Sequence, residues 1–200
     1  MRLPAEQRRP QLLEVACDVF AARGFHATSM DDVAEAAGVT KPVLYQHFPS
    51  KRALYRELLD DVDARLLAAV SQASGAGLSG RERVQEGFAA YFRFVSSHRS
   101  AFRLLFGASV RNDAEFAGIA ERTIDEIATL IAGLIDIDAP PEHRRVLAHA
   151  LVGMAEATSR RLAVAGAEDD PERLARWLAE MAWFGLRGVR ADWPVARPGG

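Results

Sequence analysis

Residues 28–55 read TSMDDVAEAAGVTKPVLYQHFPSKRALY, and this stretch decides the fold. Thr28, with an aspartate three residues later, forms a pattern typical of a capping box and predicts the start of a short helix. Gly38 predicts its end, because glycine accepts the left-handed conformation that a helix C-terminus needs. Thr40 as a cap and Pro42 in the first turn then predict a second helix. The stretch is therefore predicted to be two short helices joined by a tight turn, followed by the start of a third.

The second helix of this pair is predicted to have a buried and an exposed face. Leu44 and Phe48 are four residues apart, so both can point inward. A helix-turn-helix reads DNA in this layout when lysine, tyrosine and histidine groups bind phosphates and an amide such as Gln46 reaches base edges. The residues predicted to bind DNA are Thr28, Thr40, Lys41, Pro42, Val43, Tyr45, Gln46, His47 and Lys51. An ordinary pair of amphipathic helices with a solvated polar face is the alternative, because the general pattern is weak by itself.

The specific string favours the first interpretation. AEAAGVTK at residues 34–41, LYQHF at residues 44–48 and the SK that follows resemble the N-terminal DNA-binding domain of the tetracycline-repressor (TetR) family. Pro42 and Val43 depart from the pattern, since many members carry Gly-Thr there. The resemblance covers roughly residues 8–60 and fades afterwards. It implies a divergent C-terminal region that binds a small molecule and forms a dimer through two helices of each subunit.

Length and composition are those of an ordinary globular chain. The 200 residues suffice for one large domain or two small ones, and a 49% hydrophobic content is ample for a core. The chain has no run of 18 apolar residues, and its start, MRLPAEQRRP, lacks the apolar segment of a secretory signal. The single cysteine, Cys17, lies at helical spacing between Leu13 and Phe20 and is predicted to be a core residue. These features predict a cytoplasmic protein.

Bulk charge does not indicate a nucleic-acid-binding protein. The net charge is −2, and residues 1–52 carry 7 Lys and Arg against 6 Asp and Glu. The only two lysines of the chain, Lys41 and Lys51, both fall within the motif. DNA binding must therefore depend on where the charges are placed.

Helical periodicity continues along the chain without strand-like alternation. The prediction is an all-α protein of about nine helices, in which a three-helix N-terminal helix-turn-helix domain precedes a C-terminal helical ligand-binding and dimerisation domain. The predicted limits are residues 1–52 for the DNA-binding domain, 53–190 for the effector-binding and dimerisation domain, and 191–200 for a flexible tail. Residues 71–80, SQASGAGLSG, form the clearest linker.

Aromatic side chains on the C-terminal helices indicate either an ordinary core or a ligand cavity between helices. The TetR resemblance implies such a cavity, and the residues predicted to bind a ligand are Phe88, Phe92, Phe102, Phe106, Met154, Thr158 and Trp177. The last two helices carry more apolar faces than one contact needs. Because small residues permit close helix approach, the predicted dimer interface comprises Gly153, Ala157, Leu178, Ala182 and Gly185.

Catalysis and metal binding find no support in the sequence. The five histidines lack the H-x-x-x-H and H-E-x-x-H spacings, and no Walker A or G-x-S-x-G motif is present. We predict no catalytic residue, no cofactor and no metal. The predicted function is a sequence-specific transcriptional regulator, a homodimeric repressor released from a palindromic double-stranded DNA operator by a small-molecule effector. The alternatives are a helical small-molecule-binding protein or enzyme with a structural N-terminal helix pair, and a helical adaptor.

Overall fold

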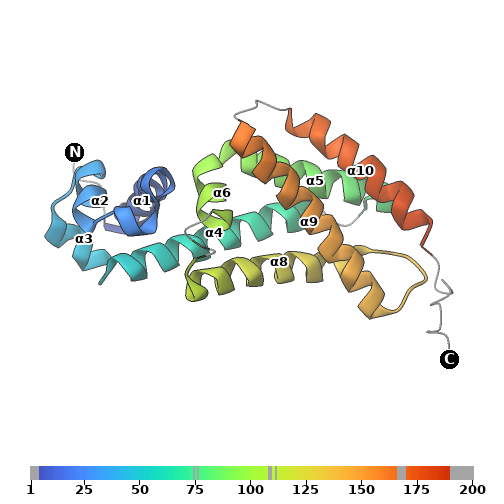
Figure 1. The fold of residues 1–200 in the computed structure, drawn as a ribbon, viewed down its shortest axis with the longest axis horizontal. Coiled ribbons are helices and arrows are strands. Elements are labelled where there is room, and N and C mark those ends of the chain that lie inside the picture. Colours follow the sequence, from blue (N-terminus) through green and yellow to red (C-terminus); the bar gives the residue numbers. More distant parts are fainter. Residues whose placement is uncertain are drawn as a thin grey trace. The chain divides into compact units, whose positions relative to one another are not determined.

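The computed structural model describes residues 5–73, 75, 77–107, 110, 112–165 and 170–189. These residues form nine helices and no strand, which confirms the predicted all-α fold. None of the described helices is both long and apolar enough to cross a membrane. The helices in chain order are α1 (Ala5–Ala27), α2 (Met30–Ala36), α3 (Lys41–His47), α4 (Lys51–Ala73), α5 (Gly80–Ser97), α6 (Arg99–Phe106), α8 (Ala114–Leu134), α9 (Pro141–Ala165) and α10 (Pro171–Arg187) (Figure 1).

The chain divides into two compact units. The first unit comprises residues 1–66 and 97–123, and the second comprises residues 67–96 and 124–200. The predicted domain limit after residue 52 falls inside α4, whose large apolar residues from Leu54 to Leu66 are buried with the first unit. The predicted tail, residues 191–200, lies outside the described residues.

In the first unit, α2 and α3 form the predicted helix pair (Figure 1). The cap of α2 is Ser29 rather than Thr28: the Ser29 hydroxyl accepts from the Asp32 N–H at 3.1 Å, and the Asp32 carboxylate accepts from the Ser29 N–H at 2.8 Å. The Thr28/Asp31 capping box is therefore wrong by one residue, because the buried Thr28 hydroxyl donates instead to the Gly24 carbonyl at 2.8 Å. The predicted turn is confirmed, since Gly38 has φ 64.

Aromatic rings fill the core of the first unit. Phe20, Phe25, Tyr55 and Phe116 pack with ring centroids 4.7–5.0 Å apart for four of their pairs. Cys17 is half-buried beside this core, and burial raises the pKa of its thiol to about 12. Its environment is therefore that of a packing residue and not of a reactive thiolate.

Helix α6 belongs to the same unit and packs against α1. Phe102 and Phe106 are buried there, with ring centroids 5.1 Å apart. Both residues were predicted to line a ligand cavity of the C-terminal region. They are instead part of the hydrophobic core of the first unit, which contains α2 and α3.

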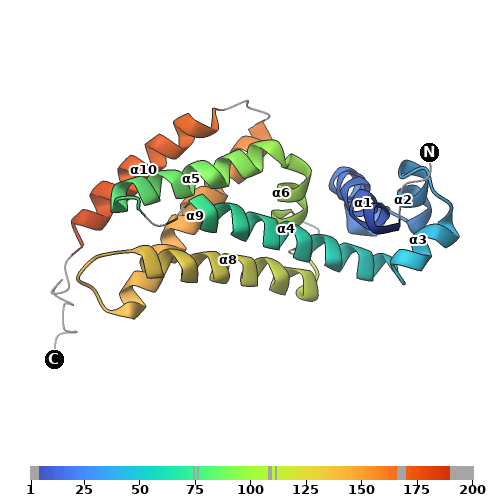
Figure 2. The same cartoon turned by 180° about the vertical axis from the view of Figure 1, so that it is seen from behind.

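The second unit contains α5, α9 and α10 with the ends of α4 and α8 (Figure 2). Local caps open two of these helices. The Ser79 N–H donates to the Glu82 carboxylate at 2.7 Å before α5, and the Asp170 carboxylate accepts from the Glu172 N–H at 3.0 Å before α10. Alternate turns of α9 and α10 bury small and aliphatic residues, so one face of each helix is committed to this unit.

Candidate DNA-reading surface and ligand cavity

Helix α3 separates its residues into a buried and an exposed face, as predicted. Leu44 and the adjoining Phe48 are fully buried. Thr40, Lys41, Pro42, Tyr45 and Gln46 are exposed, and Val43 and His47 are half-buried. The exposed face combines an ammonium, hydroxyls and an amide, which are the groups that contact phosphates and base edges.

The exposed polar groups near the start of α3 are available for a ligand at little cost. The Lys41 ammonium donates to the Asp31 carboxylate at 2.8 Å, and this hydrogen bond raises the pKa of Lys41. Both partners are largely exposed, so exchanging the carboxylate for a phosphate is inexpensive. The Thr40 hydroxyl makes no hydrogen bond to the backbone of α3.

Two arginines of the first unit, Arg9 and Arg23, already form hydrogen bonds and ion pairs with other residues of that unit. Arg9 forms a fork with Glu57 at 2.6 and 2.8 Å and donates to the His47 carbonyl, and Arg23 pairs with Asp32 at 2.7 Å. Their positive charges remain near α3, but their hydrogen-bonding groups already have partners.

Two residues expected to touch DNA are placed differently by the structure. The Thr28 side chain is buried. The Lys51 ammonium donates to the carbonyls of Phe25 and Thr28 at 2.8 Å each, and to that of His26 at 3.5 Å. These contacts correct the prediction that both side chains touch DNA, because backbone carbonyls of residues 24–28 already accept hydrogen bonds from them.

The caps of α2 and α3 give a matched pair of substitutions. Ser29→Ala removes a reciprocal capping box and is expected to lower the free energy of unfolding by about 1 kcal/mol. Thr40→Ala removes no capping hydrogen bond, so we expect a change within about 0.5 kcal/mol. Urea unfolding followed by circular dichroism measures both values. An equal loss for the two variants would contradict this assignment of the caps.

A cavity of about 230 Å³ lies within the second unit. Its walls come from α5, α8, α9, α10 and the end of α4, and they are mostly apolar; they include Val84, Phe88, Ile127, Ile131, Leu151 and Trp183. A cavity of mainly apolar lining with a few polar groups is the usual form of a small-molecule site.

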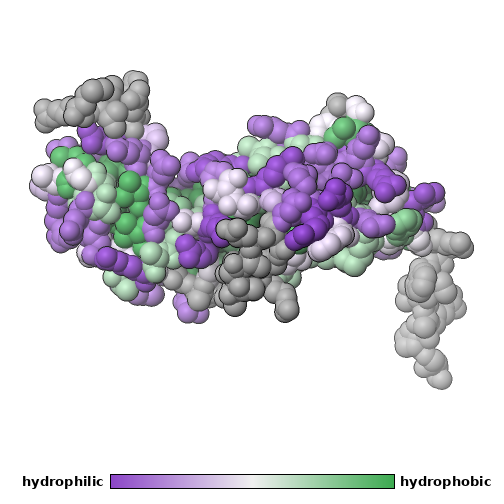
Figure 3. All heavy atoms as spheres, turned by 90° about the horizontal axis from the view of Figure 1, so that it is seen from above, coloured by the Kyte–Doolittle hydropathy of each residue, from purple (hydrophilic) through white to green (hydrophobic). Residues whose placement is uncertain are grey.

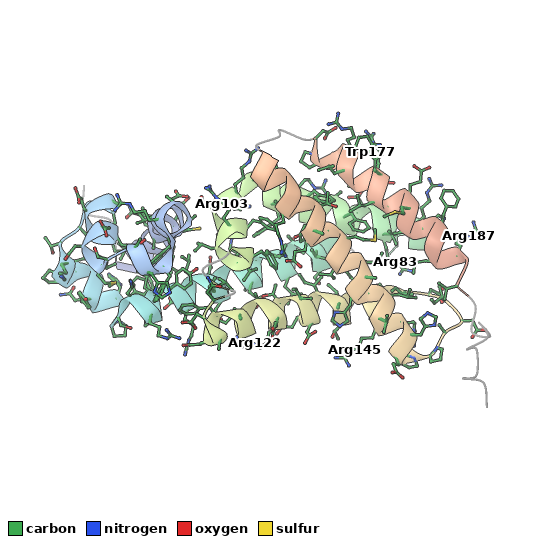
Figure 4. All side chains as sticks on the ribbon, viewed as in Figure 1. Arg83, Arg103, Arg122, Arg145, Trp177 and Arg187 are labelled. Carbon is green, nitrogen blue, oxygen red and sulfur yellow. The ribbon has the colours of Figure 1, made fainter. Side chains whose placement is uncertain are left out.

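Charged groups occupy only part of the cavity wall. Arg83 projects from α5 and Arg187 from the end of α10, and Asp136 is the only acidic residue of the lining (Figure 4). The Arg83 Nε is buried without a hydrogen-bond partner, and neither arginine forms an ion pair within the described part of the chain. The Arg187 guanidinium lies 5.9 Å from the Trp183 ring centroid. The cavity therefore has an excess of positive charge.

Of the residues predicted to bind a ligand, Phe88 lines this cavity. Phe92 is buried beside it, with ring centroids 6.4 Å apart, whereas Met154 and Thr158 are half-buried elsewhere and Trp177 is exposed. None of the residues predicted to bind a ligand lies on α8, although this helix lines the cavity. A signal was present, because Ile127, Ile131 and Leu134 recur at helical spacing.

Large apolar residues are exposed on α10 and, at one position, on α9. Val146, Trp177, Met181 and Phe184 are 58–64% exposed, although they are large and apolar. Patches of apolar surface interrupt the polar surface of the second unit in the view from above (Figure 3). We call these four residues the apolar face.

The residues predicted to form the dimer interface differ in their exposure. Gly153, Ala157 and Gly185 are exposed, and Leu178 is half-buried. Ala182 is buried, which corrects its assignment to an outer face. The reason is that α10 turns Ala175, Ala179 and Ala182 into its own unit, together with Leu174 and Leu186. The bulky side chains that remain outside are Trp177, Met181 and Phe184.

Comparison with known proteins assigns both regions of the chain. Residues 12–58 match the family of bacterial regulatory proteins described as the tetR family. Residues 81–185 match the family described as the tetracyclin repressor-like C-terminal domain.

Individual relatives match either nearly the whole chain or about half of it. The HTH-type transcriptional activator FasR of Mycolicibacterium smegmatis is 34% identical over 94% of this chain and 87% of its own length. The repressor KstR2 of Mycobacterium tuberculosis is 37% identical over 46% of each chain. The crystal structure of a TetR-like transcriptional regulator from Rhodococcus sp. RHA1 has a TM-score of 0.78 and 34% identity, and covers 94% of this chain and 100% of the other.

Proposed function

The chain belongs to the TetR family of DNA-binding transcriptional regulators, and we propose that it reads a two-fold symmetric operator as a homodimer whose DNA affinity is changed by an acidic, largely apolar small molecule. The exposed face of α3 carries the DNA-binding part of this proposal. Leu44 and Phe48 anchor the helix in the core, so Lys41, Tyr45 and Gln46 are held in one orientation toward solvent. A short anchored helix with this composition suits the major groove.

Genomic selection with the purified protein tests the proposal directly. We expect enrichment of duplexes with two inverted half-sites whose centres lie about 34–36 Å apart, or a multiple of that distance. Gln46→Ala should relax base preference at one position in each half-site and lower affinity for the selected operator about tenfold. Gel shifts on a panel of single-base operator variants measure both effects.

The triple variant Lys41→Ala, Tyr45→Ala, Gln46→Ala should lose operator binding while keeping its helical circular dichroism. Replacement of three exposed residues of the second unit, Arg81, Glu126 and Thr129, by alanine provides a control. Equal affinity of wild type and the α3 triple variant would rule out α3 as the reading helix.

The proposed dimer rests on the apolar face of α9 and α10. Trp177, Met181 and Phe184 recur at helical spacing on α10, and Val146 adds a fourth exposed apolar side chain on α9; large exposed apolar residues of this kind are typical of the core of a subunit interface. Exposed small residues, Gly153 and Ala157 on α9 and Gly185 on α10, leave room for a facing helix. A second copy of the chain can cover this surface, because a two-fold axis brings the identical apolar faces of two subunits together.

The class of effector follows from the charges on the cavity wall. The apolar lining favours an apolar body, and Arg83 and Arg187 favour an acidic group. A bound carboxylate or phosphate would give the buried Arg83 Nε the acceptor that it lacks. We therefore propose an effector with one acidic group at the end of an apolar chain or ring system.

Decanoate and decanol test this charge preference at constant chain length. Wild type should bind decanoate more tightly than decanol, and the double variant Arg83→Met, Arg187→Met should lose about tenfold in decanoate affinity with little change for decanol. Arg81→Met is the matched control, because Arg81 is exposed on the same helix and does not line the cavity. Titration calorimetry measures the affinities, and equal affinities of wild type for the two compounds would contradict an acidic effector.

A further inference from the structure

We infer that Lys51 positions the DNA-reading helix pair by joining its two ends, and does not serve as a phosphate contact. This inference rests on the proposed function of α3, but its central contact can be measured without DNA. The contact comprises the Lys51 ammonium and the carbonyls of Phe25, His26 and Thr28, and we call it the Lys51 bridge.

The Lys51 bridge closes the helix pair at both ends. Thr28 directly precedes Ser29, the cap of α2, and Lys51 is the first residue of α4. The whole of α2 and α3 lies between these two residues. The hydrogen bond from Lys51 to the Thr28 carbonyl, 2.8 Å long, therefore fixes where the pair begins relative to where it ends.

The acceptors of the bridge are presented by a local break in α1. Gly24 has φ 79, a conformation that favours glycine and kinks α1, and the helix ends three residues later at Ala27. The carbonyls of Phe25 and His26 consequently lack the partners that a continuing helix would supply. An ammonium is a favourable partner for such carbonyls, because the C-terminal end of a helix carries partial negative charge.

Few donors remain on Lys51 for DNA. An ammonium has three N–H groups, and three backbone carbonyls lie within hydrogen-bonding distance of it. It also lies 4.5 Å from the centroid of the Phe25 ring, and the residue is half-buried. A phosphate at Lys51 would have to displace a carbonyl that has no other donor nearby among the described contacts.

Lys41 provides the contrast within the same motif. Its ammonium is exposed and donates to the exposed Asp31 carboxylate, so a phosphate can replace that partner. The two lysines of the chain thus differ in role: Lys41 is suited to phosphate, and Lys51 to holding backbone segments together.

Lys41→Met and Lys51→Met form the test, because methionine keeps most of the apolar stem and removes the charge. Each variant is titrated with the selected operator and with a scrambled duplex of equal length over a range of salt concentrations. Affinities are compared at equal folded fraction, measured by circular dichroism. Amide hydrogen exchange of the DNA-free protein reports on residues 28–30.

For Lys51→Met we expect about a tenfold loss of operator affinity, an unchanged affinity for the scrambled duplex, an unchanged salt slope and faster exchange at residues 28–30. For Lys41→Met we expect weaker binding to both duplexes and a salt slope reduced by about 0.9 per reading helix. A lysine that only stabilised the fold would leave the operator-to-scrambled ratio unchanged once the folded fraction is matched.

Two results would overturn the inference. A salt slope reduced by about 0.9 per reading helix in Lys51→Met would make Lys51 a phosphate contact. Unchanged amide exchange at residues 28–30 would mean that the bridge does not hold the start of α2. Failure of the wild type to select a symmetric operator would instead contradict the proposed function, while the exchange measurement would still test the bridge.

Discussion

Replacing Phe184 with arginine is expected to convert the dimer to a monomer and to lower operator affinity by about 10²–10⁴-fold. Phe184 is 64% exposed within the subunit, so the folded subunit tolerates the larger side chain. In the proposed dimer the same side chain is covered, and an arginine there would bury a charge without a partner. The loss of DNA affinity follows because a monomer engages one half-site, without the high effective concentration that the first contact gives the second.

Light scattering measures the mass of the variant in solution, and gel shifts measure operator binding. Thr129→Arg is the matched control, since it introduces the same charge at an exposed polar position of α8 in the same unit. Circular dichroism should be unchanged in both variants. A dimeric Phe184→Arg protein would place the subunit contact away from the apolar face.

Ala182 shows why the inner and outer faces of α10 could not be assigned from the sequence. The helix carries a bulky stripe and a small stripe, and periodicity reveals both without saying which one meets its own subunit. Close packing of α10 inside the second unit uses its alanines with Leu174 and Leu186, so Trp177, Met181 and Phe184 remain outside.

Local patterns predicted the helix pair well, because caps and turns depend on neighbouring residues. The turn at Gly38, the two faces of α3 and the caps of α5 and α10 all follow from residues within one helical turn. The predicted cap of α2 was wrong by one residue because two neighbouring residues could both serve as the cap. Thr28 and Ser29 both carry hydroxyls, and the sequence does not show that the first of them is buried against Gly24.

Long-range partners account for the remaining differences. Lys51 binds carbonyls that lie 23–26 residues earlier in the chain, and no local pattern distinguishes such a lysine from one that faces phosphate. Phe102 and Phe106 have the composition expected of a cavity wall, yet α6 packs in the first unit. Arg83 was not singled out, because its significance comes from an apolar cavity formed by four other segments.

Filling the cavity should remove the effector response and leave the DNA-binding surface intact. Ala155 is buried on α9 and lines the cavity, so Ala155→Trp directs an indole into the empty space. We expect a loss of decanoate affinity of about 100-fold or more, because the ligand and the indole compete for one volume. Ile131→Trp fills the same cavity from α8 and should act in the same way, which guards against misfolding of one variant.

The paired measurement is decanoate binding by calorimetry and operator binding by gel shift, for the wild type, both cavity variants and Thr129→Trp as an exposed control. Operator affinity without ligand should stay within about threefold of wild type for all of them, because α3 and its supporting core belong to the first unit. A ligand changes DNA affinity only through its different affinities for the two conformers, typically about 1–3 kcal/mol. A cavity variant that no longer binds ligand must therefore also lose the change in operator affinity that ligand causes. If Ala155→Trp and Ile131→Trp both retained that change, the effector would have to bind outside this cavity.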